Sequence, residues 1–123
     1  MEILDMQVAT FELLKSISIL KKVSTDYPSN WSTFPTAIYR TSRNPHFIDN
    51  KQDELQTFWV ITVEIYGDDR SGDLMPIAVC IDKKFKKIGF KGTFKDGNTA
   101  GLTRIICEFS AVVDNTTKYV FQK

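Results

Sequence analysis

The sequence is poor in the side chains that most often carry chemistry: it has one histidine and two cysteines. Two thiols are too few for a disulfide framework or a structural zinc site. Cys80 and Cys107 each lie within an apolar run. We interpret them as buried, reduced thiols that pack as small apolar side chains, with a disulfide between them as the alternative.

Catalytic motifs are lacking as well. The sequence contains no nucleophile elbow, P-loop, dinucleotide-binding glycine pattern, HExxH or CxxC. His46 and Asp49 form the only base-and-orienter pair, and no nucleophile or oxyanion loop accompanies them. Glu64 and Glu108 are a possible carboxylate pair, but an ion pair with Arg104 on a half-exposed sheet is the commoner arrangement. We therefore predict no enzymatic activity, no cofactor and no metal site.

The chain also lacks a charge excess and a long apolar run. A formal net charge of +1 argues against a dedicated nucleic-acid binder, although a neutral chain can line a channel through which DNA passes. No apolar run approaches the roughly 20 residues of a membrane span. The N-terminus has no signal-peptide layout, which favours folding in the cytoplasm. No linker or internal repeat divides the sequence, so residues 1–123 are predicted to form a single domain.

What is present is a clear alternation of helical and strand patterns. Apolar residues recur at helical spacing in two segments and alternate in strand-like segments. We predict an α+β fold in the order α-β-β-α-β-β-β, a mostly antiparallel sheet with both helices packed on it. The predicted helices span residues 5–23 and 71–89, and the predicted strands span 34–42, 57–66, 90–96, 102–114 and 118–122. Between the first two strands, residues 43–56 are predicted to form a long polar loop.

The strand at 57–66 has one face that is plainly apolar, made by Trp59, Ile61, Val63 and Ile65. The opposite face, shared with the strand at 102–114, is more apolar than water-facing strands require, because it shows Phe58, Val60, Tyr66, Ile106 and Val112. Two interpretations stay open at this point. Either this second face packs against another chain, or the two helices cover opposite sides of the sheet.

The succession of several segments resembles tail terminator proteins of long-tailed bacteriophages and prophages, also called tail completion or tail-to-head joining proteins. The segments are PSNW, FPTAIYRTSRNPHFIDN, ELQTFWVITVEIYG, IDKKFKKIGF and LTRIICEFSAVVDNTTKYVF. The similarity runs from about Leu14 to Phe121 and consists of pattern and element order. Other neck components, such as head-closure or tail-tube subunits, and a protein-binding domain unrelated to phages are the alternatives.

The resemblance implies a structural virion protein without catalysis or cofactor. Such proteins form a ring, commonly a hexamer, that caps the tail tube in the virion neck and offers a surface to the head connector. Partners would then be further copies of the chain, the tail tube protein and the connector protein. Two residue sets are predicted to make these contacts. The expected docking loop comprises Arg43, His46, Phe47, Ile48, Asp49 and Asn50; the expected subunit contact or lumen comprises Thr62, Glu64, Arg104 and Glu108.

Overall fold

A six-stranded, mostly antiparallel sheet forms the centre of the structure. The structure is a computed structural model that describes residues 5–27, 33–68, 72–97 and 102–121. The strand order is β1-β2-β3-β5-β4, with β6 paired to β5 beyond the beginning of β4. The strands are β1 (Lys22–Ser24), β2 (Thr36–Ile48), β3 (Glu54–Gly67), β4 (Lys91–Asp96), β5 (Thr103–Asp114) and β6 (Val120–Phe121). With its two helices this sheet confirms the predicted α+β class.

The first helix, α1 (Met6–Lys15), is shorter than predicted. Asp5 caps its start, because its Oδ1 accepts from the backbone N–H of Gln7 at 2.9 Å. The helix ends where serines and β-branched isoleucines begin to alternate, and the Ser16 hydroxyl bonds back to the Leu13 carbonyl. The predicted continuation to residue 23 is therefore wrong.

Residues 16–20 instead form a turn, and β1 follows as an added strand parallel to β2. Ile17 and Leu20 stay buried there, although they are not helical. Part of the turn predicted after the first helix, residues 28–31, lies outside the described residues.

The second helix, α2 (Met75–Lys87), lies within the predicted span 71–89 but begins four residues later and ends two residues earlier. Asp73 Oδ1 accepts from the Met75 N–H at 3.0 Å, and Pro76 lies in the first turn, where no N–H is required. Lys84, Lys86 and Lys87 lie in the last turn, where the helix dipole favours cations. Gly89 then has φ +94°, the left-handed conformation that ends the helix.

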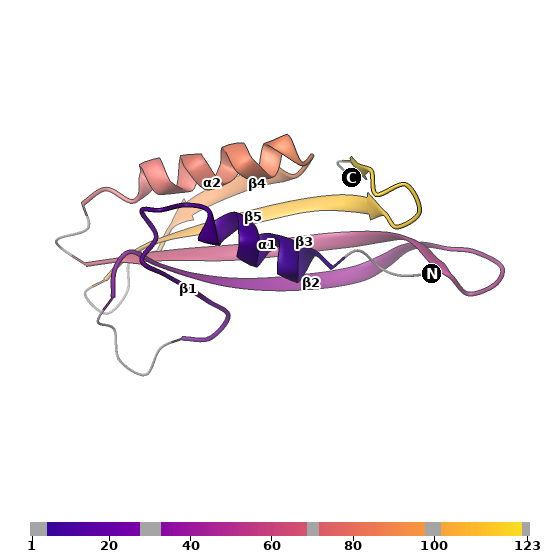
Figure 1. Cartoon of the computed structure of the whole chain (residues 1–123), viewed down its shortest axis with the longest axis horizontal. Helices are drawn as coiled ribbons and strands as arrows, with labels where there is room; N and C mark the ends of the chain where they lie inside the picture. Colours follow the sequence, from indigo (N-terminus) through magenta and orange to yellow (C-terminus); the bar gives the residue numbers. More distant parts are fainter. Residues whose placement is uncertain (1–4, 28–32, 69–71, 98–101, 122–123) are drawn as a thin grey trace.

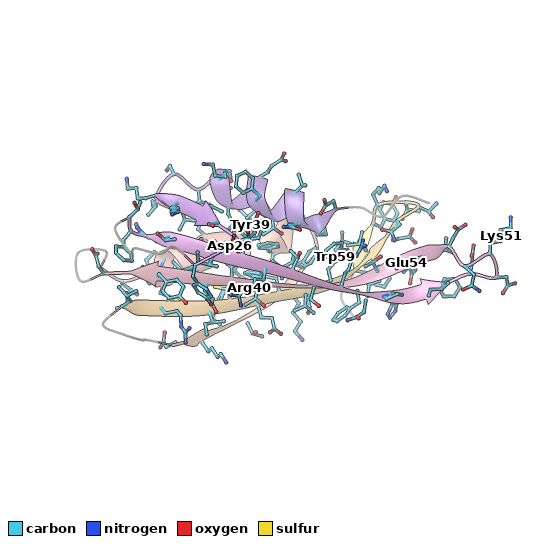
Figure 2. All side chains as sticks on the ribbon, turned by 90° about the horizontal axis from the view of Figure 1, so that it is seen from below. Asp26, Tyr39, Arg40, Lys51, Glu54 and Trp59 are labelled. Carbon is cyan, nitrogen blue, oxygen red and sulfur yellow. The ribbon has the colours of Figure 1, made fainter. Side chains whose placement is uncertain are left out.

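Both helices cover the same face of the sheet. Side chains of α1 and α2 join the odd-numbered residues of β3 and β5 in one apolar cluster. α1 lies over β1 and β2, and α2 lies over β4 and β5 (Figure 1). Tyr39 points to the helices and Arg40 points to the opposite side (Figure 2). The interpretation in which the helices cover opposite sides is therefore wrong, and neither of the two described helices lies over the second sheet face.

The core is densest where α2 meets β5. The rings of Phe85 and Phe109 stack with centroids 4.2 Å apart, and Phe90 meets Phe85 edge-on. Gly92 of β4 passes so close that an added Cβ would lie 2.6 Å from the Phe109 ring. Both cysteines are free, and burial raises the pKa of Cys107 to about 12, so this thiol is inert. Cys80 is only partly buried, unlike the prediction.

Candidate functional site

The sheet face opposite the helices is the first candidate site, and we call it the open face. It is built from the even-numbered residues of β3 and β5, which alternate with the core residues. Thr62 pairs in register with Arg40 on one side and Glu108 on the other, and Ile106 pairs with Glu64. Apolar Val60 and Ile106 are half-buried among these polar neighbours. The face is thus neither a dry core nor a fully solvated surface.

One end of the open face carries an aromatic and charged cluster. Glu64 Oε2 accepts from the hydroxyls of Tyr27 at 2.7 Å and Tyr66 at 2.9 Å. The Tyr27 ring meets the Tyr66 ring edge-on, and the Arg40 guanidinium lies 4.9 Å from the Tyr27 centroid. Arg104 donates to the Gly97 carbonyl and lies over the Tyr66 ring. These contacts orient five charged or phenolic side chains at this end of the face.

Burial raises the pKa of Tyr66 to about 12, and the hydrogen bond to Glu64 acts in the same direction. Tyr66 therefore remains a hydrogen-bond donor at neutral pH. The sequence placed Glu64, Tyr66 and Arg104 on one face, but Tyr66 was not among the predicted contact residues, and its hydrogen bonds to the other two were not predicted. It also missed Tyr27, which reaches the sheet from a segment with no strand pattern.

The predicted subunit-contact residues share a face but do not form one cluster. Glu64 and Arg104 lie at the aromatic end, connected through Tyr66. Thr62 and Glu108 form a separate cross-strand pair in the middle of the sheet. The open face therefore offers a charged end and a mixed middle, and a partner would contact both.

The second candidate site is the far end of the β2–β3 hairpin, residues 43–56, which we call the hairpin arm. The prediction of a long loop here is wrong, because β2 continues to Ile48 and β3 begins at Glu54. Arg43, His46, Phe47 and Ile48 therefore lie in a strand, with a register shift around His46. The arm extends past both helices (Figure 1). Its exposed side chains and Pro45 gave no alternating pattern by which the strand could be recognised.

Only Asp49 and Asn50 of the predicted docking residues lie in the turn of the arm. Asp49 Oδ1 accepts from the backbone N–H groups of Lys51 and Asp53, both at 2.9 Å. This Asx turn gives Asp49 a structural role. Phe47 and Ile48 beside the turn are 52% and 48% exposed. Of the side chains of the arm, these two apolar ones are the best suited to burial against a partner.

Comparison with known protein families gives no match for the sequence, and none of the curated proteins compared with it matches either. The resemblance to tail terminators therefore depends on the quoted segments and their order alone. Within the described residues, no helix is long and apolar enough to cross a membrane. The same part of the chain brings together no group of three or more His, Cys, Asp or Glu side chains suited to a metal ion.

Proposed function

We propose that this chain is a tail terminator of a long-tailed bacteriophage or prophage. In this role it is a structural protein without catalysis, assembled in the host cytoplasm and located in the virion neck. Copies of the chain form a ring, which we take to be a hexamer, on the end of the tail tube. The ring stops tube growth and offers its outer surface to the head connector, and DNA passes through it without sequence-specific contacts.

The observation that carries the proposal is the open face. Both described helices pack on one side, and half-buried Val60 and Ile106 lie on the other side, where neither of these helices covers them. A mixed apolar and charged surface of this kind suits a subunit interface. In a ring, each interface joins one patch of a subunit to a different patch of its neighbour. We assign the open face to one side of that contact.

The hairpin arm supplies a second contact of a different kind. It lies beyond the helices, so Phe47 and Ile48 can reach a partner without disturbing the sheet. Two exposed apolar side chains beside a fixed turn are suited to insertion into a neighbouring protein. We assign the arm to the tail tube protein or the connector protein.

Loss of the gene tests the assignment most directly. Without a terminator, tube subunits continue to add, so the phage or prophage should produce tails of abnormal and variable length. Tail length in electron micrographs is the measurement, and restoration by the gene supplied in trans is the control. Tails of normal length in the deletion strain would rule out the terminator assignment.

Substitution of Ile48 by lysine tests whether the hairpin arm contacts a partner. A charged side chain at this exposed position should leave the fold intact and disfavour an apolar contact, so that heads and tails fail to join or tails fail to be capped. Ile19→Lys is the matched control, because Ile19 is also an isoleucine and is 57% exposed in the turn after α1. Infectious particle counts should fall for Ile48→Lys alone; equal counts for both variants would remove the arm from the interface.

A further inference from the structure

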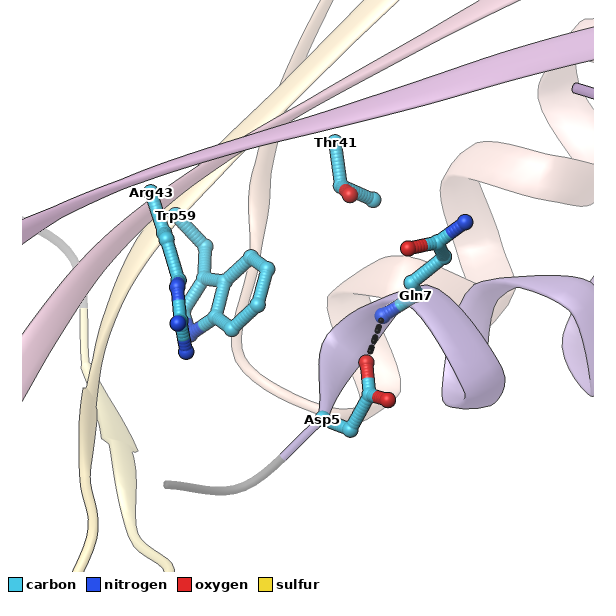
Figure 3. Close-up of a pocket in the computed structure, with 5 residues that line it drawn as sticks. All are labelled: Asp5, Gln7, Thr41, Arg43 and Trp59. Atoms are coloured by element: carbon cyan, nitrogen blue, oxygen red, sulfur yellow. Dashed lines mark hydrogen bonds between the residues drawn. The ribbon is translucent and has the colours of Figure 1, made fainter.

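A hollow with a volume of about 380 Å³ lies between the start of α1 and the strands β2 and β3. Asp5 and Gln7 line it from the helix, Thr41 and Arg43 from β2, and Trp59 from β3 (Figure 3). The two strands place Arg43 directly opposite Trp59 in register. The hollow is on the helix side of the sheet and thus separate from the open face.

Trp59 is the unusual residue of this hollow. Its side chain is 4% exposed, and its indole N–H has no hydrogen-bond acceptor among the described residues. A buried donor without an acceptor destabilises the fold, and nearly all buried donors in proteins have a hydrogen-bond partner. A ligand with an acceptor atom would form the missing hydrogen bond. The indole N–H therefore favours binding of such a ligand.

Arg43 provides a second donor beside the first. Its guanidinium carbon lies 5.8 Å from the Trp59 ring centroid, and its nitrogens end next to the indole nitrogen (Figure 3). No acidic side chain of the described residues lies within ion-pair distance of it, and Asp5 uses its Oδ1 to cap α1. Arg43 is exposed, so its side chain has room to turn from the indole toward a ligand.

We propose that this hollow binds a carboxylate group. The two oxygens of a carboxylate match the planar fork of Arg43 and can accept from the Trp59 N–H at the same time. The carboxylate of Asp5 in the wall opposes a doubly charged phosphate more strongly than a singly charged group. Thr41 and Gln7 offer neutral hydrogen-bonding groups to the atoms that carry the carboxylate. The site does not depend on the tail assignment.

The two tryptophans of the chain make the proposal testable by NMR, because ¹⁵N labelling gives one indole N–H signal for each. Trp31→Phe identifies the signal of Trp59. Titration with a glutamate residue blocked at both ends should shift the Trp59 signal downfield and saturably, at millimolar to tens of millimolar ligand. The blocked glutamine residue, which has no charge, should produce no saturable shift.

Matched variants link the shift to the site. Arg43→Gln should weaken binding at least about tenfold, since it removes a charged hydrogen-bond partner. Arg40 lies on the same strand but on the other face of the sheet. The Arg40→Gln variant should therefore bind the blocked glutamate as tightly as the unchanged chain does. Absence of a saturable shift, or equal binding by the Arg43→Gln variant, would overturn the proposal.

The choice of ligand distinguishes the sources of the carboxylate. Binding of the blocked glutamate at least as tight as that of acetate supports an acidic side chain of a partner protein. Binding of acetate alone supports a free small carboxylate. Tighter binding of inorganic phosphate than of either would overturn the carboxylate assignment.

Discussion

Phe109→Ala is expected to lower the free energy of unfolding by about 3–5 kcal/mol. Phe109 is fully buried in the middle of β5 and stacks on Phe85 of α2. Phe94 meets the same ring edge-on from β4, so the substitution removes contacts to both α2 and β4. The close approach of Gly92 would leave part of the resulting cavity without a side chain to fill it.

Thermal unfolding followed by circular dichroism measures this effect. A domain of this length loses roughly 4 °C of Tm for each kcal/mol, so a fall of about 10–20 °C is expected. Phe11→Ala is the control, because Phe11 is 39% exposed on α1 and its loss should cost no more than about 1 kcal/mol. Equal falls for the two variants would contradict the placement of the core between α2 and β5.

The sequence predicted this core because its periodicity is strong there. Alternation in β3 and β5 and helical spacing in α2 each identify the buried face, and local turn residues mark the ends of these elements. Ile17 and Leu20 lie at helical spacing with the apolar residues of the predicted first helix, and both are buried, although the structure places them in a turn. Apolar spacing thus indicated which side chains are buried, but it did not decide whether the backbone around them is helical.

The hairpin arm shows where such prediction fails. Residues 43–48 are exposed on both sides of the strand, so neither alternation nor apolar content distinguishes them from a loop. Their strand conformation is imposed by pairing with β3, which is a non-local cause. The cluster around Glu64 and the hollow beside Trp59 have the same origin, because each joins segments that are distant in the sequence.

Val60→Glu is expected to abolish ring assembly while leaving the subunit folded. Val60 is half-buried on the open face, and its cross-strand partners are the neutral Ser42 and Ser110. In the free subunit a glutamate at this position remains solvated. The free energy of unfolding should therefore fall by no more than about 1 kcal/mol. In a subunit interface the same charge would be buried without a partner, which costs about 3 kcal/mol or more and weakens association more than about a hundredfold.

Sedimentation velocity across a range of protein concentrations measures the assembly. The unchanged chain should sediment as a ring, or form one as concentration rises, whereas Val60→Glu should remain a monomer with an unchanged Tm. Met75→Glu adds the same charge at a residue that is 38% exposed at the start of α2, on the helix layer, and should still form rings. If Val60→Glu forms rings of normal mass, the open face does not join subunits and faces the lumen instead. If only the Met75→Glu variant fails to assemble, the subunit contact lies on the helix layer and not on the open face.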